Sequence, residues 1–243
     1  MRDRRVFIGD VTRKEFRLMI EDGTIKAAIV PVGSTEQHHE HLEMLHDTAS
    51  VAYIAQQAAL ELYPEVVIAT PIPIGVSEHW MEHKGTLTVR PEVFAQYVYD
   101  VCDSLKRGGI NTILILNGHG GNVRPIMRRI EEFKERLKVT LQFNSYWDVY
   151  DEEFVKTWMD NKGCPGHAGE YETSFAFAAF PERVHTEDIE YDDAKLGTRE
   201  KGEAMIPAAV DGVVTILKAM IAGQPVGIEP RSFRPGGVVS MVR

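Results

Sequence analysis

The sequence contains few cysteines, and their placement excludes two classes of small, cross-linked protein. Only Cys102 and Cys164 occur in 243 residues, and they form no CxxC pair. A disulfide scaffold or a cysteine-rich zinc module needs more thiols at closer spacing. A low cysteine content is typical of proteins that work in a reducing compartment, so we expect a cytoplasmic protein.

Long hydrophobic runs and an excess of positive charge are also missing. No run approaches 18 consecutive apolar residues, so we expect neither a membrane span nor a membrane partner. The opening MRDRRVFIGD has no apolar stretch behind its basic residues, which argues against a signal peptide. The 27 lysines and arginines against 36 aspartates and glutamates give a net charge of −9, which argues against nucleic acid as a partner.

Short apolar runs alternate with longer helical patterns along the chain. The strand-length runs lie at 27–32, 66–69, 111–116 and 139–143, and the helical patterns lie at 47–62, 91–107, 123–137, 148–159 and 203–222 and from 169 onward. This alternation predicts an α/β fold with a mostly parallel sheet covered by helices. No linker composition interrupts it, so we expect a single domain over residues 1–243, ending in an irregular segment of 20 residues rich in glycine and proline.

A polar cluster follows each predicted strand. In chain order these clusters are GSTEQHHEH, VSEHWMEH, NGHGGN and NSYWD. Ligands of open α/β sheets bind beyond the carboxyl ends of the strands, so four clusters of this kind predict one site at one edge of the sheet.

The clusters contain a set of nitrogen and oxygen donors suited to divalent metal ions. Glu36 and His38 are two residues apart, and in an extended loop their side chains project the same way. Asp47 stands at the start of a predicted helix, His119 lies between glycines, and Glu172 lies within the motif HAGEYETS. Histidine and carboxylate donors without thiolates suit Zn²⁺, Mn²⁺ or Fe²⁺.

Each of these residues also has a structural interpretation. Asp47 alone is a good helix N-cap, His119 is compatible with an ordinary loop histidine, and Glu172 is a favourable partner for a helix dipole. Glu43 and His46 are expected on a solvated loop. Only the joint pattern favours a metal site.

These residues resemble the creatininase family of metal-dependent amidohydrolases. The matches cover about residues 25 to 180 and comprise GSTEQH with Asp47 nine beyond His38, SEH at 77–79, NGHGGN at 117–122 and HAGEYETS at 167–174. The resemblance implies a three-layer α/β/α fold, two divalent metal ions per subunit, and a homohexamer or other homo-oligomer. It also implies that Glu36, Asp47 and His119 hold one metal ion, while His38, Asp47 and Glu172 hold the other.

Three departures from the family pattern argue against creatinine as the substrate. Enzymes of this family that act on creatinine have Tyr and Glu at the positions of Gly120 and Gly121, and a Trp-Asp pair at the positions of Gly163 and Cys164. Relatives also commonly read EQHGPHLP where this chain has EQHHEHLE. Other members cleave formamide groups on pyrimidines, trim a peptide, or hydrolyse a carbon–carbon bond in a keto-inositol ring.

We therefore expect a two-metal hydrolase in which a metal-bound hydroxide attacks the carbonyl of a small, polar, cyclic substrate at a C–N amide bond. The polar groups near the metals also suit a hydroxyl-rich substrate, so ring-opening C–C hydrolysis of a keto-inositol is the alternative. A small-ligand-binding protein without catalysis is the second alternative. His167 is the expected proton donor, and it also suits stabilisation of the oxyanion, with Glu172 as the second catalytic residue.

The candidate substrate contacts are spread over three of the clusters. They are Ser77, His79, Trp147, His39 and Glu40, and Trp147 is equally compatible with a core aromatic. His79 and His83 also match an HxxEH zinc-protease pattern, which needs a long helix to place both histidines on one face. The glycines at 75 and 85 leave no room for such a helix.

Overall fold

Four parallel strands form the centre of the molecule. The computed structural model describes residues 4–161 and 163–230. Strands β1 (Ala27–Val32), β2 (Val66–Ile68), β3 (Thr112–Asn117) and β4 (Thr140–Ser145) pair in the order β2-β1-β3-β4. The strands are almost entirely buried, as expected of a parallel sheet covered on both faces. The predicted α/β class is confirmed.

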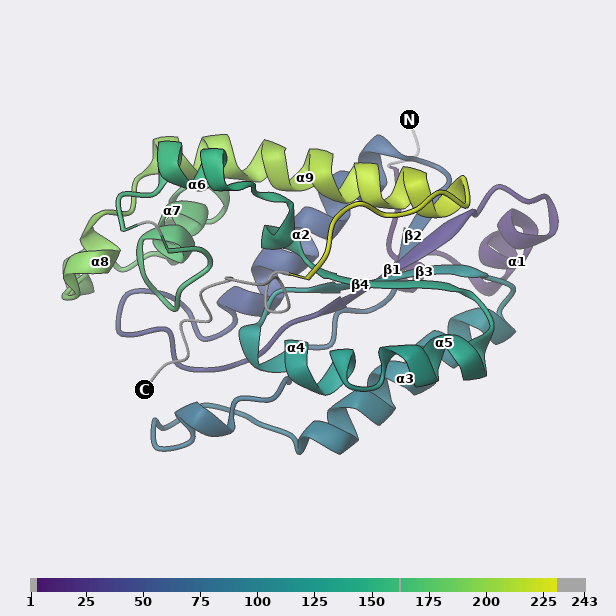
Figure 1. Cartoon of the computed structure of the whole chain (residues 1–243), viewed down its shortest axis with the longest axis horizontal. Coiled ribbons are helices and arrows are strands. Elements are labelled where there is room, and N and C mark those ends of the chain that lie inside the picture. Colours follow the sequence, from purple (N-terminus) through teal and green to yellow (C-terminus); the bar gives the residue numbers. More distant parts are fainter. Residues whose placement is uncertain (1–3, 162, 231–243) are drawn as a thin grey trace.

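Helices cover the two faces of the sheet and make a three-layer sandwich (Figure 1). Helices α2 (His46–Glu61), α7 (Glu170–Ala179) and α9 (Arg199–Ile221) pack on one side, and α3 (Pro91–Arg107), α4 (Gly120–Met127) and α5 (Ile130–Leu137) pack on the other. The remaining helices are α1 (Arg13–Glu21), α6 (Glu152–Trp158) and α8 (Asp192–Lys195). Short 3-10 turns lie at Ile8–Asp10, Glu78–Trp80, Tyr146–Val149, Pro181–Arg183 and Thr186–Asp188.

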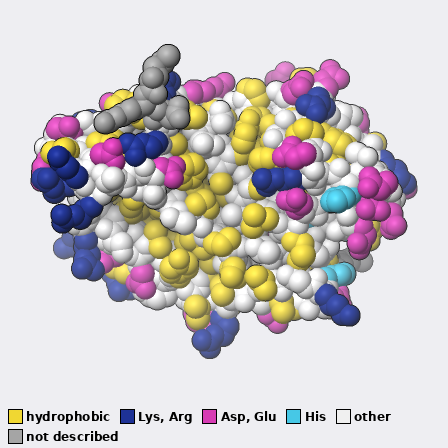
Figure 2. Space-filling model, turned by 180° about the vertical axis from the view of Figure 1, so that it is seen from behind, with side chains coloured by type: hydrophobic (Ala, Val, Ile, Leu, Met, Phe, Trp, Pro, Cys, Tyr) yellow, Lys and Arg dark blue, Asp and Glu magenta, His cyan; other side chains and the backbone are white. Residues whose placement is uncertain are grey.

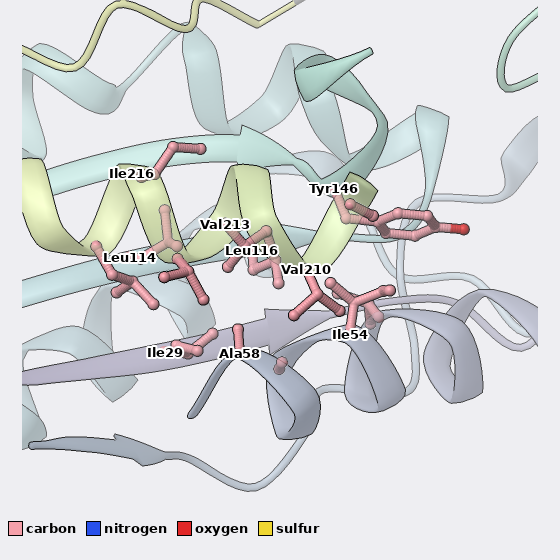
Figure 3. Close-up of a cluster of buried hydrophobic side chains, with 14 of the residues drawn as sticks. Ile29, Ile54, Ala58, Leu114, Leu116, Tyr146, Val210, Val213 and Ile216 are labelled. Atoms are coloured by element: carbon pink, nitrogen blue, oxygen red, sulfur yellow. The ribbon is translucent and has the colours of Figure 1, made fainter. Parts of the chain in front are cut away.

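The core between the sheet and the α2/α9 layer joins early and late segments of the described chain. Figure 3 shows side chains of β1 and β3, such as Ile29 and Leu114, meeting Ile54 of α2 and Val213 of α9. These four side chains have no exposed surface. Burying a side chain of this size stabilises the fold by about 1.5–3 kcal/mol. Helix α9, near the end of the sequence, therefore contributes substantially to holding β1 and α2 in place.

Two predicted helices are wrong in detail. The pattern at 123–137 forms two helices, α4 and α5, because Arg129 leaves helical geometry with φ −121° and ψ 0°. Pro125, which cannot donate a helical hydrogen bond, lies inside α4. The pattern at 148–159 is a 3-10 turn followed by α6, since Asp148 closes a capping box with Ser145 and Asp151 caps a new helix through the Phe154 amide.

Helix α1 was not predicted, although its signal is present in the sequence. Thr12 and Glu15 form a capping box, in which each side chain accepts a hydrogen bond from the other's backbone N–H. Residues 224–230 contain no helix or strand, in agreement with the irregular ending expected, and the rest of that ending lies outside the described residues.

Helix α9 is long and apolar enough to cross a membrane by length and composition alone. Its best 18-residue window has a mean hydropathy of 1.7. However, α9 packs against α2 and α7, and its apolar side chains belong to the core of Figure 3. The core position accounts for its hydrophobic character.

Candidate metal centre

The five predicted metal ligands come together at the carboxyl end of the sheet. Glu36 and His38 lie in the loop after β1, Asp47 lies in the first turn of α2, His119 is the N-cap of α4, and Glu172 lies in the first turn of α7. Each of them is at most 5% exposed. These five residues are spread over 137 positions of the sequence, from Glu36 to Glu172, and they form one buried cluster.

Asp47 lies at the middle of this cluster. Its Oδ1 is 3.1 Å from Nε2 of His38, and its Oδ2 is 2.9 Å from Nδ1 of His119. Glu172 Oε2 is 3.7 Å from the same nitrogen of His38, and Glu36 Oε1 is 3.4 Å from the same nitrogen of His119. The two oxygens of one carboxylate thus face two separate groups of donors.

The hydrogen bonds of His38 and His119 leave their inner nitrogens available to a metal ion. Nδ1 of His38 is 3.0 Å from the backbone carbonyl of Glu36, and Nε2 of His119 is 3.0 Å from the carbonyl of Val76. A carbonyl oxygen only accepts, so each of these outer nitrogens carries hydrogen. Metal-binding histidines are ordinarily oriented by such a bond from the second ring nitrogen.

The electrostatics of the cluster indicate that it needs positive charge. Burial by itself lowers the pKa of both histidines, but Asp47 and Glu172 outweigh it at His38 and raise that pKa to about 10. Glu36 and Asp47 likewise raise the pKa of His119 to about 9. Burial raises the pKa of Glu172 to about 8. Protons thus accumulate where a cation would otherwise balance three buried carboxylates, and metal binding would release them.

The donor set fits divalent metal ions. Among the described residues, the buried oxygen Oε2 of Glu36 has no hydrogen-bond partner, and an unpaired buried carboxylate oxygen is costly unless a metal ion uses it. Three groups of donor atoms lie close enough to share an ion, namely His38 with Asp47 and Glu172, Glu36 with His79 and His119, and Glu36 with His38 and His167. A further group, made of His185, Glu187 and Asp188, is exposed.

The glycines and asparagines of NGHGGN fix the position of His119. Asn117 accepts the backbone N–H of His119 and donates to its carbonyl, at 3.1 and 2.8 Å. Asn122 links the same loop to its neighbours by accepting from the Val76 amide and donating to the Gly33 carbonyl. A Cβ at Gly121 would lie 2.0 Å from the Val76 carbonyl oxygen, so only glycine allows this close packing.

His167 lies beside the cluster rather than inside it. Its Nδ1 is 3.5 Å from Oε1 of Glu36, and its ring is stacked on Trp80 at a centroid distance of 4.4 Å. Burial, together with the neighbouring His38, lowers the pKa of His167 to about 2. The ring is therefore neutral at physiological pH.

Comparisons with known proteins identify the family of this chain. The family model for creatininase, described as creatinine amidohydrolase, matches residues 9–214. The chain belongs to the creatininase family. It is 31% identical over 186 residues to a 3-dehydro-scyllo-inosose hydrolase of Thermotoga maritima, covering 75% of this chain and 58% of the length of that relative. It is 24% identical to a creatinine amidohydrolase of Pseudomonas putida, covering 88% of this chain and 96% of that protein.

Solved creatininase structures share the fold of this chain. A manganese form of creatininase superposes with a TM-score of 0.80 and 23% sequence identity, covering 91% of this chain and 99% of that one. A mutant creatininase of Zn-Zn type has a TM-score of 0.79 with the same identity and coverage. Creatininase structures therefore carry manganese or zinc, and this chain has groups of residues suited to such ions.

The predicted substrate residues do not share one environment in this member of the creatininase family. His79 lies at the edge of the cluster, with its ring parallel to that of His119 at 6.0 Å, and His39 is stacked on Tyr191 at 3.8 Å. Glu40 is exposed next to His39. Ser77 is fully buried and hydrogen-bonded to Ser34 at 2.6 Å.

The surroundings of Ser77 and Trp147 are therefore those of residues that support the structure, not those of substrate contacts. Ser77 also lies 3.4 Å from Nε2 of His119, so it helps to hold that ring in place. Trp147 is 4% exposed and packs on Tyr146 within the main core, which favours the core interpretation.

Of the two residues expected on a solvated loop, Glu43 is exposed, whereas the expectation is wrong for His46. His46 is the first residue of α2, is 5% exposed and lies 5.3 Å from the ring of His38. The neighbouring His41 is also buried and bonds to Thr173 at 2.9 Å. This loop packs against α7, since His41 bonds to Thr173 and the ring of His46 lies 6.1 Å from that of Phe175.

Three residues near the centre were missed by sequence analysis, namely Gln37, Trp80 and Tyr191. Gln37 lies 2.8 Å from His167, between two predicted ligands, so its position in GSTEQH was the available signal. Tyr191 lies far along the chain in a polar segment, and no local pattern marks it.

Proposed function

We propose that this protein is a two-metal hydrolase that cleaves a small, polar, cyclic carbonyl substrate at a C–N amide bond. The observation that carries the proposal is the position of Asp47, whose two oxygens each face a different histidine. A carboxylate in this position is suited to bridge two ions. Glu36 and His119 would complete one ion's protein ligands, and His38 and Glu172 would complete the other's.

Divalent ions bound there would polarise a carbonyl group and acidify water. The protein itself would hold the ligands in fixed positions. The backbone carbonyls behind His38 and His119, together with Ser77 and the NGHGGN loop, restrain the two rings by hydrogen bonds. His167 also faces the centre without being one of the five proposed ligands, since its Nδ1 is directed at Glu36.

The surroundings of the centre suit an uncharged, hydroxyl-rich substrate. Burial lowers the pKa of both His39 and His79, so these rings are neutral at physiological pH. A neutral imidazole offers one donor and one acceptor, as a hydroxyl group does. Tyr191 adds an aromatic surface 52% exposed to solvent beside His39.

Ring-opening C–C hydrolysis of a keto-inositol is the second candidate. The neutral imidazoles favour it, as does the 31% identity to an inosose hydrolase. The C–N candidate is supported by the relative that matches over nearly its whole length, a creatinine amidohydrolase. Gly120 and Gly121 argue against creatinine itself as the substrate.

A substrate panel tests the proposal. Protein loaded with Mn²⁺ or Zn²⁺ is incubated with cyclic amides, formamidopyrimidines and keto-inositols, and the products are followed by NMR. We expect hydrolysis of at least one cyclic amide. Opening of a carbocyclic ketone without amide turnover would replace the lead candidate by the second, and binding without any turnover would favour a non-catalytic protein.

The substitution Glu172→Gln tests the ligand assignment. Loss of one carboxylate from the second group of donors should remove about one equivalent of metal and most of the activity. The metal content per chain, measured by elemental mass spectrometry, tests this expectation. Glu187→Gln, in the exposed group with His185 and Asp188, is the matched control and should change neither quantity. Full metal occupancy in E172Q would contradict the assignment.

We also propose that the protein is a homo-oligomer, the hexamer being the form that the family resemblance implies. Figure 2 shows hydrophobic side chains gathered over the middle of one face, with charged side chains mainly around them. Leu87, Val93 and Tyr97 are each more than 40% exposed. Contiguous apolar surface is typical of an interface, so light scattering should give a mass at least twice the 27.3 kDa of one chain, and a mass of 27.3 kDa would contradict the proposal.

A further inference from the structure

The side-chain amide of Gln37 joins two groups whose hydrogen-bonding roles can be determined. Its Oε1 lies 2.9 Å from the backbone nitrogen of His39, and its Nε2 lies 2.8 Å from Nε2 of His167. A backbone N–H only donates, so the amide oxygen must face His39 and the amide NH₂ must face His167. The opposite orientation of the amide would place two donors against each other.

The orientation of Gln37 determines which nitrogen of His167 carries hydrogen. The Gln37 NH₂ group donates to Nε2 of His167, so this nitrogen must accept with its lone pair. A neutral imidazole has one N–H and one lone pair, and the hydrogen therefore lies on Nδ1. This Nδ1 is the atom 3.5 Å from Oε1 of Glu36, so the N–H of His167 is directed toward the metal centre.

His167 is thus the reverse of the two histidines assigned as ligands. In His38 and His119 the outer nitrogen carries hydrogen, because it faces a carbonyl, and the inner nitrogen is left to bind metal. In His167 the outer nitrogen has the lone pair and the inner nitrogen carries hydrogen. Although His167 lies close enough to share an ion with Glu36 and His38, this tautomer does not bind metal.

We propose that Gln37 is a positioning residue that holds His167 as the Nδ1–H tautomer, which makes His167 a hydrogen-bond donor to the oxyanion formed when the substrate carbonyl is attacked. The inference rests on the proposed function. It changes the role expected from sequence, because a neutral imidazole that gave up its only N–H would become an imidazolate. His167 then stabilises charge without losing a proton, as in an oxyanion hole.

The surrounding contacts hold both partners in this arrangement. The backbone N–H of Gln37 donates to Oγ1 of Thr86 at 3.1 Å, and His39 adopts a left-handed conformation with φ 55°, which brings its N–H back to the Gln37 side chain. The Trp80 ring covers one face of His167. The tautomer of His167 therefore depends on the segment from Gln37 to His39, in which the backbone of Gln37 and the side chain of Gln37 are both held by hydrogen bonds.

Nitrogen-15 NMR of the zinc-loaded protein reads the tautomer directly. With ¹⁵N-labelled histidine, and with His167→Asn to identify the signals, we expect a protonated Nδ1 and an unprotonated, metal-free Nε2 at His167. In Gln37→Glu the carboxylate can only accept, so Nε2 should become protonated. In Gln37→Met neither tautomer is favoured and both should be present. A protonated Nε2 in the unchanged protein, or the same tautomer in all three proteins, would overturn the proposal.

Kinetics then separate this inference from the proposed function. For whichever substrate of the panel is turned over, Q37E should lower kcat by about 100-fold, a typical effect for one oxyanion-hole donor, with KM and metal content little changed. Gln57→Glu is the control of equal charge, because it lies ten residues past Asp47, about 15 Å along α2. If Q37E changes the tautomer but keeps the kcat of the unchanged protein, the positioning role is overturned. If no substrate of the panel reacts, the proposed function fails and the tautomer assignment still stands on the NMR result.

Discussion

At the scale of single residues, glycine and histidine control the metal centre in different ways. The glycines let the β3–α4 loop approach the centre, since a Cβ at Gly118 would lie 2.4 Å from the backbone oxygen of Asp47. The histidines share one residue type but differ in the partner behind each ring. A carbonyl behind His38 and His119 leaves their inner nitrogens available to the proposed metal ions, whereas an amide NH₂ behind His167 places its hydrogen on the inner nitrogen.

Gly121→Ala tests how much the close packing matters. The added Cβ would lie 2.0 Å from the Val76 oxygen and 2.5 Å from Nε2 of His119, so His119 must move and metal affinity should fall at least tenfold. The matched control is Gly120→Ala, because nothing lies within 4 Å of a Cβ at that position. Metal titration by calorimetry measures both variants. Equal affinities would show that His119 does not depend on this contact.

At the scale of elements, the segment before α7 carries His167 and is tied down by a buried ion pair. Glu170, at the start of α7, has no exposed surface and accepts the backbone N–H groups of Asp160 and Asn161, both at 2.9 Å. Lys201 of α9 contacts Glu170 and lies 2.7 Å from Asp160. Two helices and the segment that carries His167 are thus joined through one carboxylate.

Lys201→Ala should leave the buried charge of Glu170 without its cation. The cost of breaking a buried ion pair is about 3 kcal/mol, and we expect a loss of this size in the free energy of unfolding. The control Lys195→Ala removes an exposed lysine paired with Asp192, which should cost less than about 1 kcal/mol. Urea denaturation measures both. Similar losses in the two variants would contradict the buried-pair interpretation.

The cap of α1 gives a stability effect with a defined pH dependence. Hydrogen bonds from Arg5 and from the Thr12 backbone lower the pKa of Glu15 to about 2, against 4.5 for an unperturbed glutamate. A lowered folded-state pKa stabilises the protein above pH 4.5 and loses that effect as the pH falls toward 2. The stability difference between the unchanged protein and Glu15→Gln should therefore shrink between pH 5 and pH 3 in denaturation curves. A difference that grows on acidification would contradict this assignment.

At the scale of the whole molecule, the metal centre should act as a cross-link between the two halves of the sequence. The ligands come from the β1–α2 region, from the β3–α4 loop and from α7, and all of them are buried. The centre therefore joins segments that the core already brings near one another. When the metal ions are removed from the centre, three buried carboxylates remain that have little contact with solvent.

Chelation should therefore lower Tm, and adding Mn²⁺ or Zn²⁺ back should restore it. A ligand present at 1,000 times its Kd stabilises a folded protein by about 4 kcal/mol, which sets the scale of the effect. Differential scanning calorimetry measures Tm before chelation, after it and after reconstitution. Ca²⁺, which prefers oxygen ligands, is the control ion and should restore less. An unchanged Tm after confirmed metal removal would contradict a stabilising centre.

Sequence analysis predicted most of the sheet and the meeting of the five proposed ligands at one edge of it, because these depend on local patterns at the ends of strands. The four strands were recognised from apolar runs, and β1 has the predicted bounds, Ala27–Val32. Glu36 and His38 were recognised because they are neighbours at the end of a strand. The break between α4 and α5 was missed because helical periodicity continues through Arg129 although the backbone does not.

The amino-acid sequence by itself determined the fold class, the family and the type of donor atom, since each depends on residue type and spacing along the chain. Only the tertiary structure decided that Trp147 is a core residue, that His46 is buried, and that Gln37 lies between His39 and His167. The physical reason is that hydrogen bonding and burial depend on distances between segments that are remote in sequence. The role of a histidine follows from the atom that the fold places behind its ring.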